Sequence, residues 1–283
     1  MDQTYCIGNF VFRLRCPDRL TVPENFQKFA ADAVPAYTYD IILAQRLPLP
    51  EGRIIAQRQD ITVFATQTGE ARLIGVNGNP APYACYEEAS PDAARVTLAE
   101  DRIGGMSIDP MFVSLLALEK RLLGCSSMVL HTAFIVHEGE AILFSAPSET
   151  GKSTQAGLWE RYRGSRTVNG DRGLLCKADG RWTAGGWPVC GSSKICNVET
   201  YSIRAIVMLS QSKEDRCRRL TPGEAFSQIY SQITVNRWNR ADTVKAMDLL
   251  EDLVQSVPVY HLGCTISENA VACLEQALKE EKS

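Results

Sequence analysis

Residues 146–154, with the sequence APSETGKST, have the types and spacing best suited to chemistry. They match the phosphate-loop fingerprint G-x-x-x-x-G-K-[ST], with Ala146 in place of the first Gly. An Ala there costs little as long as its φ is negative. In such loops backbone N–H groups and the Lys surround phosphate, and the Ser hydroxyl contributes to a Mg²⁺ site. The stretch therefore predicts a phosphate or nucleotide site, against the alternative of a chance match in a turn. The predicted binding residues are Ala146, Pro147, Ser148, Glu149, Thr150, Gly151, Lys152, Ser153 and Thr154.

Three more side chains are candidates for chemistry beside this loop. Asp171 carries a carboxylate that could hold Mg²⁺ or accept the proton of an attacking hydroxyl. The alternative for Asp171 is a simple turn residue. Arg172 could pair with Asp171 or bind phosphate, and the alternative is a solvated surface residue. His131 lies near an apolar run, where a lone His is more often a core residue than a functional one.

The elements around the loop should bring these residues to one sheet edge. Strands over residues 129–136 and 140–145 are predicted to form a hairpin, and the loop leads into a helix over 152–163. A strand over 166–169 follows, so Asp171 should emerge beside the loop. The other predicted elements are a helix over 111–123 opened by Asp109 and Pro110, a hairpin turning at 178–180, strands over 203–209 and 257–262, and helices over 222–233, 241–254 and 267–278.

Residues 1–105 are predicted to form a separate β-rich block. Short strands are expected over 5–14, 40–47, 54–65 and 71–76. No motif in this block carries recognisable chemistry, and its charged residues are expected on a solvated sheet face. The predicted domains are therefore 1–105 and 106–283, and the second holds the phosphate loop and the C-terminal helices.

The composition of the chain argues against several classes of function. A net charge of −3 and a pI near 5.8 give no electrostatic footprint for nucleic acid, and no basic run suggests a membrane surface. The N-terminus lacks the pattern of a signal peptide, and no apolar run is long enough to cross a bilayer. We expect a cytoplasmic protein that binds neither nucleic acid nor membrane. Its ten scattered cysteines, without a C-x-x-C pair, favour reduced thiols over a zinc site.

The order of these motifs resembles the HPr kinase/phosphorylase family, which shares a nucleotide-binding core with phosphoenolpyruvate carboxykinase. That family has a His, then G-x-S-G-x-G-K-S, then D-D-R. Here His131 stands 146 − 131 = 15 residues before the loop, and Asp171 with Arg172 matches the end of D-D-R. The likeness covers about residues 105–265. It implies an α/β (α+β) fold: a carboxykinase-type P-loop core with a mixed sheet, preceded by the β-rich domain.

Three departures separate this chain from true HPr kinases. Gly170 replaces the first Asp of D-D-R, Glu149 replaces the loop's middle Gly, and Thr154 replaces an acidic residue. These differences argue against HPr as the substrate and against strong reverse phosphorylase activity. The chain is therefore similar to a diverged serine-kinase-like paralogue.

The resemblance implies an ATP-dependent kinase that uses Mg²⁺ and transfers the γ-phosphoryl group to a hydroxyl of a peptide, a protein or a small molecule. Lys152 would neutralise the phosphates, Ser153 and Asp171 would hold Mg²⁺, and Asp171 would also take the proton. His131 would orient or polarise the acceptor side, and Arg172 is counted with Asp171, Lys152 and His131 as a catalytic residue. The β-rich domain would contribute to acceptor recognition, and a homo-oligomer is left open. Two alternatives remain: a nucleotide-binding regulator with diminished catalysis, and another carboxykinase-type phosphotransfer enzyme.

Overall fold

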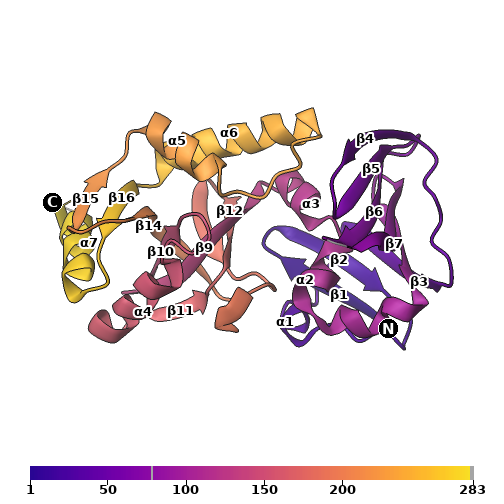
Figure 1. The fold of residues 1–283 in the computed structure, drawn as a ribbon, viewed down its shortest axis with the longest axis horizontal. Coiled ribbons are helices and arrows are strands. Elements are labelled where there is room, and N and C mark those ends of the chain that lie inside the picture. Colours follow the sequence, from indigo (N-terminus) through magenta and orange to yellow (C-terminus); the bar gives the residue numbers. More distant parts are fainter. Residues whose placement is uncertain (78, 281–283) are drawn as a thin grey trace. The chain divides into compact units, whose positions relative to one another are not determined.

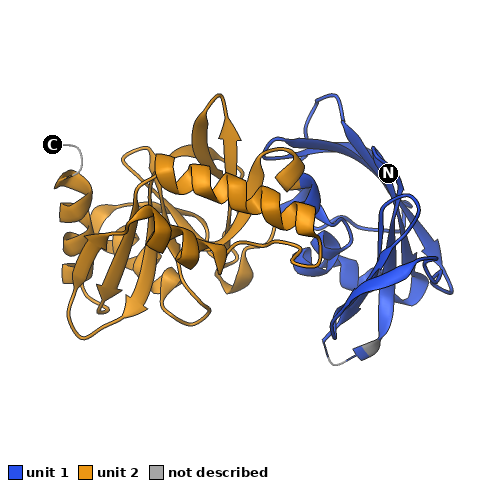
Figure 2. Cartoon of the chain, turned by 90° about the horizontal axis from the view of Figure 1, so that it is seen from above, with its two compact units in different colours: residues 1–121 blue, residues 122–283 orange. Residues whose placement is uncertain are grey.

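The computed structural model describes residues 1–77 and 79–280 of the chain. The chain divides into two compact units, residues 1–121 and residues 122–283 (Figure 2). Together they make a mixed α+β protein whose two sheets both contain parallel and antiparallel strands. No helix within residues 1–77 and 79–280 is long and apolar enough to span a bilayer.

Unit 1 is built on an eight-stranded sheet with the order β1-β2-β3-β8-β7-β6-β5-β4. Its strands are β1 (Asp2–Ile7), β2 (Phe10–Arg15), β3 (Tyr37–Ala44), β4 (Arg53–Gln57), β5 (Ile61–Ala65), β6 (Glu70–Val76), β7 (Asn79–Ser90) and β8 (Ala93–Ala99). The strand predicted over 5–14 is a hairpin, because Gly8 turns the chain with φ +59°. The strand predicted over 54–65 is likewise two strands. β7 and β8 were not predicted.

The helix predicted over 111–123 is two helices, α2 (Asp109–Ser114) and α3 (Leu118–Gly124). Ala117 separates them with a left-handed φ of +46°. Asp109 does not cap α2 through its side chain, and accepts a hydrogen bond from Asn25 Nδ2 at 2.9 Å instead. The ring of Phe112 packs against Phe26, with centroids 4.9 Å apart. These contacts join α2 to α1 (Glu24–Gln27), and η1 (Glu100–Ser107) contacts both α2 and β8. The units therefore divide after residue 121 rather than near residue 105.

Several charged residues of unit 1 are buried, contrary to the expectation of a solvated sheet face. Arg72 is only 3 % exposed, and its guanidinium contacts Glu70 and Glu119 at 2.6 Å each. Glu88 is 7 % exposed and pairs with Lys120 Nζ at 2.6 Å. Buried charges are tolerated only when they are paired, so these carboxylates serve the packing of unit 1.

Unit 2 contains residues 146–154, the predicted phosphate loop (Figure 1). Its strands are β9 (Ser127–His137), β10 (Glu140–Ser145), β11 (Arg166–Asn169), β12 (Arg172–Ala178), β13 (Arg181–Gly185), β14 (Thr200–Gln211), β15 (Arg216–Arg219) and β16 (Val259–Cys264). Its helices are α4 (Lys152–Arg163), η2 (Gly191–Ser193), α5 (Pro222–Tyr230), α6 (Arg240–Ser256) and α7 (Glu268–Glu280). The hairpin, the helix after the loop and the strand after that helix all lie where the sequence predicts them.

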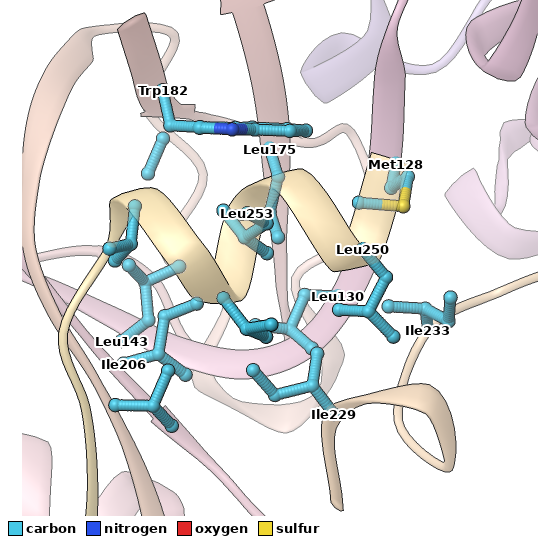
Figure 3. Close-up of a cluster of buried hydrophobic side chains, with 14 of the residues drawn as sticks. Met128, Leu130, Leu143, Leu175, Trp182, Ile206, Ile229, Ile233, Leu250 and Leu253 are labelled. Atoms are coloured by element: carbon cyan, nitrogen blue, oxygen red, sulfur yellow. The ribbon is translucent and has the colours of Figure 1, made fainter. Parts of the chain in front are cut away.

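Strand β10 lies inside the sheet, antiparallel to β9 and parallel to β14. Its side chains alternate between two hydrophobic cores, as expected for a strand covered on both faces. Leu143 faces the core formed with α5 and α6 (Figure 3), and Phe144 faces the core formed with α4 and α7. Helices on both faces therefore fix the strand whose carboxyl end opens into the loop.

Candidate functional site

The loop begins where β10 ends. Ala146 is 1 % exposed and belongs to the core beneath α4, so its methyl group is used for packing. Among the described residues it is not one of those with positive φ. An Ala can therefore replace the Gly of the fingerprint without backbone strain.

Two later loop residues have left-handed backbones. Gly151 has φ +116°, a conformation that favours Gly, and it caps α4. Glu149 has φ +65°, which costs a non-Gly residue about 1 kcal/mol or more. The loop thus has, at Glu149, a backbone conformation for which Gly is best suited. It also adds a carboxylate to the site.

Lys152 begins α4 and folds back over the loop. Its side chain is 7 % exposed, and Nζ donates to Ala146 O at 2.9 Å and to Pro147 O at 3.0 Å. Burial lowers the pKa of Lys152, Asp171 opposes this effect, and Arg172 adds to it. The first N–H groups of α4 have no acceptor within the helix, so this end of α4 attracts anions. Lys152 and the helix end together provide the positive potential that a phosphate needs.

Asp171 is held by the buried side chain of Asn169. Asn169 Oδ1 accepts from the backbone N–H groups of Asp171 and Arg172, both at 2.9 Å. The turn orients the Asp171 carboxylate toward two basic groups. Arg172 Nε donates to Asp171 Oδ2 at 3.2 Å, and His131 Nε2 lies 3.6 Å from Asp171 Oδ1. Asn169 was not among the predicted site residues.

The strand register explains why His131 meets Asp171. β9 is antiparallel to β10 and places Thr132 opposite Ser145, at the end of β10. His131 is the next residue, and it pairs across the sheet with Arg172 of β12. Burial lowers the pKa of His131, and Lys152 and Arg172 lower it further, against smaller opposing effects of Asp171 and Gln232. At neutral pH the imidazole is therefore uncharged and can accept or donate a hydrogen bond.

The lowered pKa of His131 predicts a loss of stability in acid. Below about pH 6.5, His131 binds a proton more readily in the unfolded chain than in the folded protein. The free energy of unfolding therefore falls as the pH falls. His131→Asn should flatten this part of the pH dependence, because Asn does not titrate. Urea unfolding of both proteins at about pH 7 and about pH 5.5 checks the prediction. Equal acid losses in the two proteins would contradict it.

The loop, Asp171 and His131 border one cavity of about 300 Å³. Predicted residues that line it are His131, Ser148, Glu149, Gly151, Lys152, Ser153, Thr154 and Asp171. Arg172 stands beside the cavity through its contact with Asp171, whereas Ala146, Pro147 and Thr150 belong to the loop without lining it. Gly170 and Ser192 also line the cavity, and Ser192 was not predicted. It comes from a loop that no phosphate motif identifies.

A larger cavity of about 830 Å³ lies in unit 1. Its lining includes Glu88, whose carboxylate is already bonded to Lys120 and Arg121 and accepts from the backbone N–H of Glu70 at 2.8 Å. The smaller cavity brings a Lys, a helix N-terminus, a carboxylate and an imidazole together. Because it combines these groups, it is the candidate functional site.

Side chains of the cavity offer the oxygen atoms that Mg²⁺ prefers as ligands. Within residues 1–77 and 79–280, no cluster of three or more His, Cys, Asp or Glu side chains could hold a metal. Mg²⁺ in phosphoryl-transfer sites commonly takes one or two carboxylates and completes its shell with phosphates and water. Ser153 and Asp171, which line the same cavity, are side chains of the right kind for that role.

Comparisons with known proteins found a matching family model and a set of distantly similar solved structures. The model of the family described as "SynChlorMet cassette protein ScmC" matches residues 100–279. No curated protein matches the chain. Among solved structures, the Hpr(Ser) kinase/phosphatase from Coxiella burnetii is 12 % identical, with a TM-score of 0.33. That match covers 54 % of this chain and 90 % of the Coxiella chain.

Proposed function

The chain belongs to the family of the SynChlorMet cassette protein ScmC, and we propose that it is an ATP-dependent kinase. It transfers the γ-phosphoryl group of ATP to a hydroxyl, that of a Ser in a peptide or protein or that of a small molecule. The observation that carries this proposal is one cavity lined by Lys152, the first turn of α4 and Asp171.

Each group has a separate task in the proposed transfer. Lys152 and the free N–H groups of α4 bind the phosphates and offset their charge. Ser153 and Asp171 hold Mg²⁺, which supplies further positive charge to the phosphate oxygens when bound. The Asp171 carboxylate accepts the proton of the acceptor hydroxyl as its oxygen attacks. Neutral His131, whose Nε2 lies 3.6 Å from Asp171 Oδ1, orients the acceptor hydroxyl by hydrogen bonding.

A nucleotide-binding regulator is the second candidate. It is favoured by Gly170, which stands where the related kinases have the first Asp of D-D-R. A Cβ atom at residue 170 would lie 2.2 Å from Ser193 Oγ, so Ser193 fills the space that the missing side chain would need. A regulator and a kinase both bind ATP, and only the kinase turns it over.

Nucleotide binding is tested by Lys152→Ala. ATP with Mg²⁺ should raise the melting temperature of the unaltered protein, because a ligand at a hundred times its Kd adds about 2.7 kcal/mol to the free energy of unfolding. The variant should lose most of this shift, since its loop retains the N–H groups but lacks the ammonium group. Differential scanning calorimetry with and without ATP–Mg²⁺ measures the effect.

Lys245→Ala is the matched control, because Lys245 is an exposed residue of α6 whose Nζ donates to Gly124 O at a long 3.5 Å. It should keep the full nucleotide-induced shift. A Lys152→Ala protein that folds and shows the same shift as the unaltered protein would refute the loop assignment. ADP formation by the unaltered protein then separates the kinase from the regulator.

A further inference from the structure

A short turn lies directly against Asp171. It comprises η2 and Lys194, and Gly191 within it has φ +59°. A Cβ atom at Gly191 would lie 3.0 Å from Asp171 Cβ and 3.2 Å from Asp171 Cγ. A side chain at residue 191 would require Asp171 or the turn to move. The backbone of the turn thus packs on the carboxylate that we propose as the base.

The turn is tied to the same side chain that holds Asp171. Asn169 Nδ2 donates to Trp187 O at 2.8 Å and to Val189 O at 3.2 Å, just before the turn. Asn169 is fully buried. One buried amide therefore fixes both the backbone of Asp171 and the segment that leads into the turn.

The two serines of the turn differ in their partners. Ser193 Oγ donates to Cys190 O at 2.7 Å and accepts from Ile195 N at 3.2 Å, so its hydroxyl holds the turn together. Ser192 is exposed and lines the cavity with Lys152 and Asp171. Within the part of the chain that the structure describes, the Ser192 hydroxyl makes no hydrogen bond. It is thus an unengaged hydroxyl in a cavity suited to phosphate.

We propose that Ser192 is an autophosphorylation site, modified in cis by the chain's own cavity; this inference rests on the proposed kinase function. Ser192 Oγ attacks the γ-phosphorus of ATP and forms the new P–O bond. The bond from that phosphorus to the β–γ bridging oxygen breaks, and ADP leaves. The Ser192 hydroxyl proton goes to the Asp171 carboxylate. The products are phosphoserine at residue 192 and ADP.

The test incubates the whole chain with ATP–Mg²⁺ and maps phosphate by peptide mass spectrometry. The unaltered protein should gain one phosphate at Ser192, at a rate constant that does not change with protein concentration. Ser192→Ala should lose this phosphate. Ser192→Thr is the matched control, because it restores a hydroxyl at the same position and should regain part of the modification.

The other outcomes separate this inference from the proposed function. An ATP-induced melting shift and ADP formation without phosphate on Ser192 would overturn the inference and leave the kinase standing. Phosphate on another residue, with Ser192→Ala modified as fully as the unaltered protein, would also overturn it. A rate constant that rises with protein concentration would rule out transfer in cis. Absence of both nucleotide binding and ADP formation would remove the kinase and the inference together.

Discussion

Asp171→Asn is expected to lower phosphoryl transfer by about 10²–10⁴-fold, the usual contribution of a general base. Asn has the shape and size of Asp but cannot take the acceptor proton. The affinity for ATP should change far less, because the proposed binding mode assigns the main phosphate contacts to Lys152 and the N–H groups of α4. ADP formation with water as the acceptor and the nucleotide-induced melting shift, measured on the same samples, test both expectations.

Asp248→Asn is the control for this experiment. Asp248 is an exposed residue of α6 in the same unit, so the same chemical change there should leave ADP formation unaltered. Asp171→Asn also weakens the contact with Arg172, whose Nε lies 3.2 Å from the carboxylate. Thermal unfolding of each variant therefore accompanies the kinetics, to show that the variant is folded.

The two measurements together distinguish three roles of Asp171. A base gives a large loss of turnover with nearly constant ATP affinity. A metal ligand gives a parallel loss of turnover and of Mg²⁺-dependent ATP binding. A turn residue changes neither, because Asn169 bonds to the backbone N–H of Asp171 and not to its side chain. Unchanged turnover in the folded variant would remove Asp171 from the mechanism, and with it the main argument for a kinase.

The elements nearest the loop could be predicted because their signals are local. The apolar run of β10, the Gly before Lys152 and the Gly164 that ends α4 with φ +64° all lie within a few residues of the feature they determine. Antiparallel pairing then brings His131 to the end of β10, which follows from the short hairpin alone. Local sequence patterns were therefore enough to predict the elements that position the loop and His131.

The parts that could not be predicted depend on contacts between distant segments. Ser192 lines the cavity, and the segment before its turn is bonded to strand β11 by the buried amide of Asn169, some 20 residues away in the chain. Neither Asn169 nor Ser192 was among the predicted site residues, because their types alone indicate a turn. In unit 1, the pairing of Arg72 with Glu119 bridges 47 positions. The local sequence around Arg72 therefore predicts a solvated side chain, although this side chain is buried in the structure.

Asn169→Ala is expected to lower stability and activity together. The substitution removes two acceptor contacts, to the N–H groups of Asp171 and Arg172, and two donor contacts, to Trp187 O and Val189 O. Each buried group left without a partner costs about 1–3 kcal/mol. Some of these groups will regain water, so we expect a total loss of about 2–4 kcal/mol in the free energy of unfolding.

The activity loss should exceed what unfolding explains. With Asn169 gone, the backbone of Asp171 and the segment leading to Ser192 lose their common support, and a misplaced base costs catalysis even in a folded protein. ADP formation should therefore fall by about 10-fold or more at a temperature where urea titration shows the variant fully folded.

Asn197→Ala is the matched control. Asn197 also bonds to β11, but its Nδ2 contacts to Thr167 O and Val168 O are long, at 3.4 and 3.5 Å. Its loss should cost less than about 1 kcal/mol and leave ADP formation nearly unchanged. Equal effects of the two substitutions would show that Asn169 has no special part in holding the base. A folded Asn169→Ala protein with full turnover would show that Asp171 is positioned by its side-chain contacts to Arg172 and His131, and not by the buried amide beneath it.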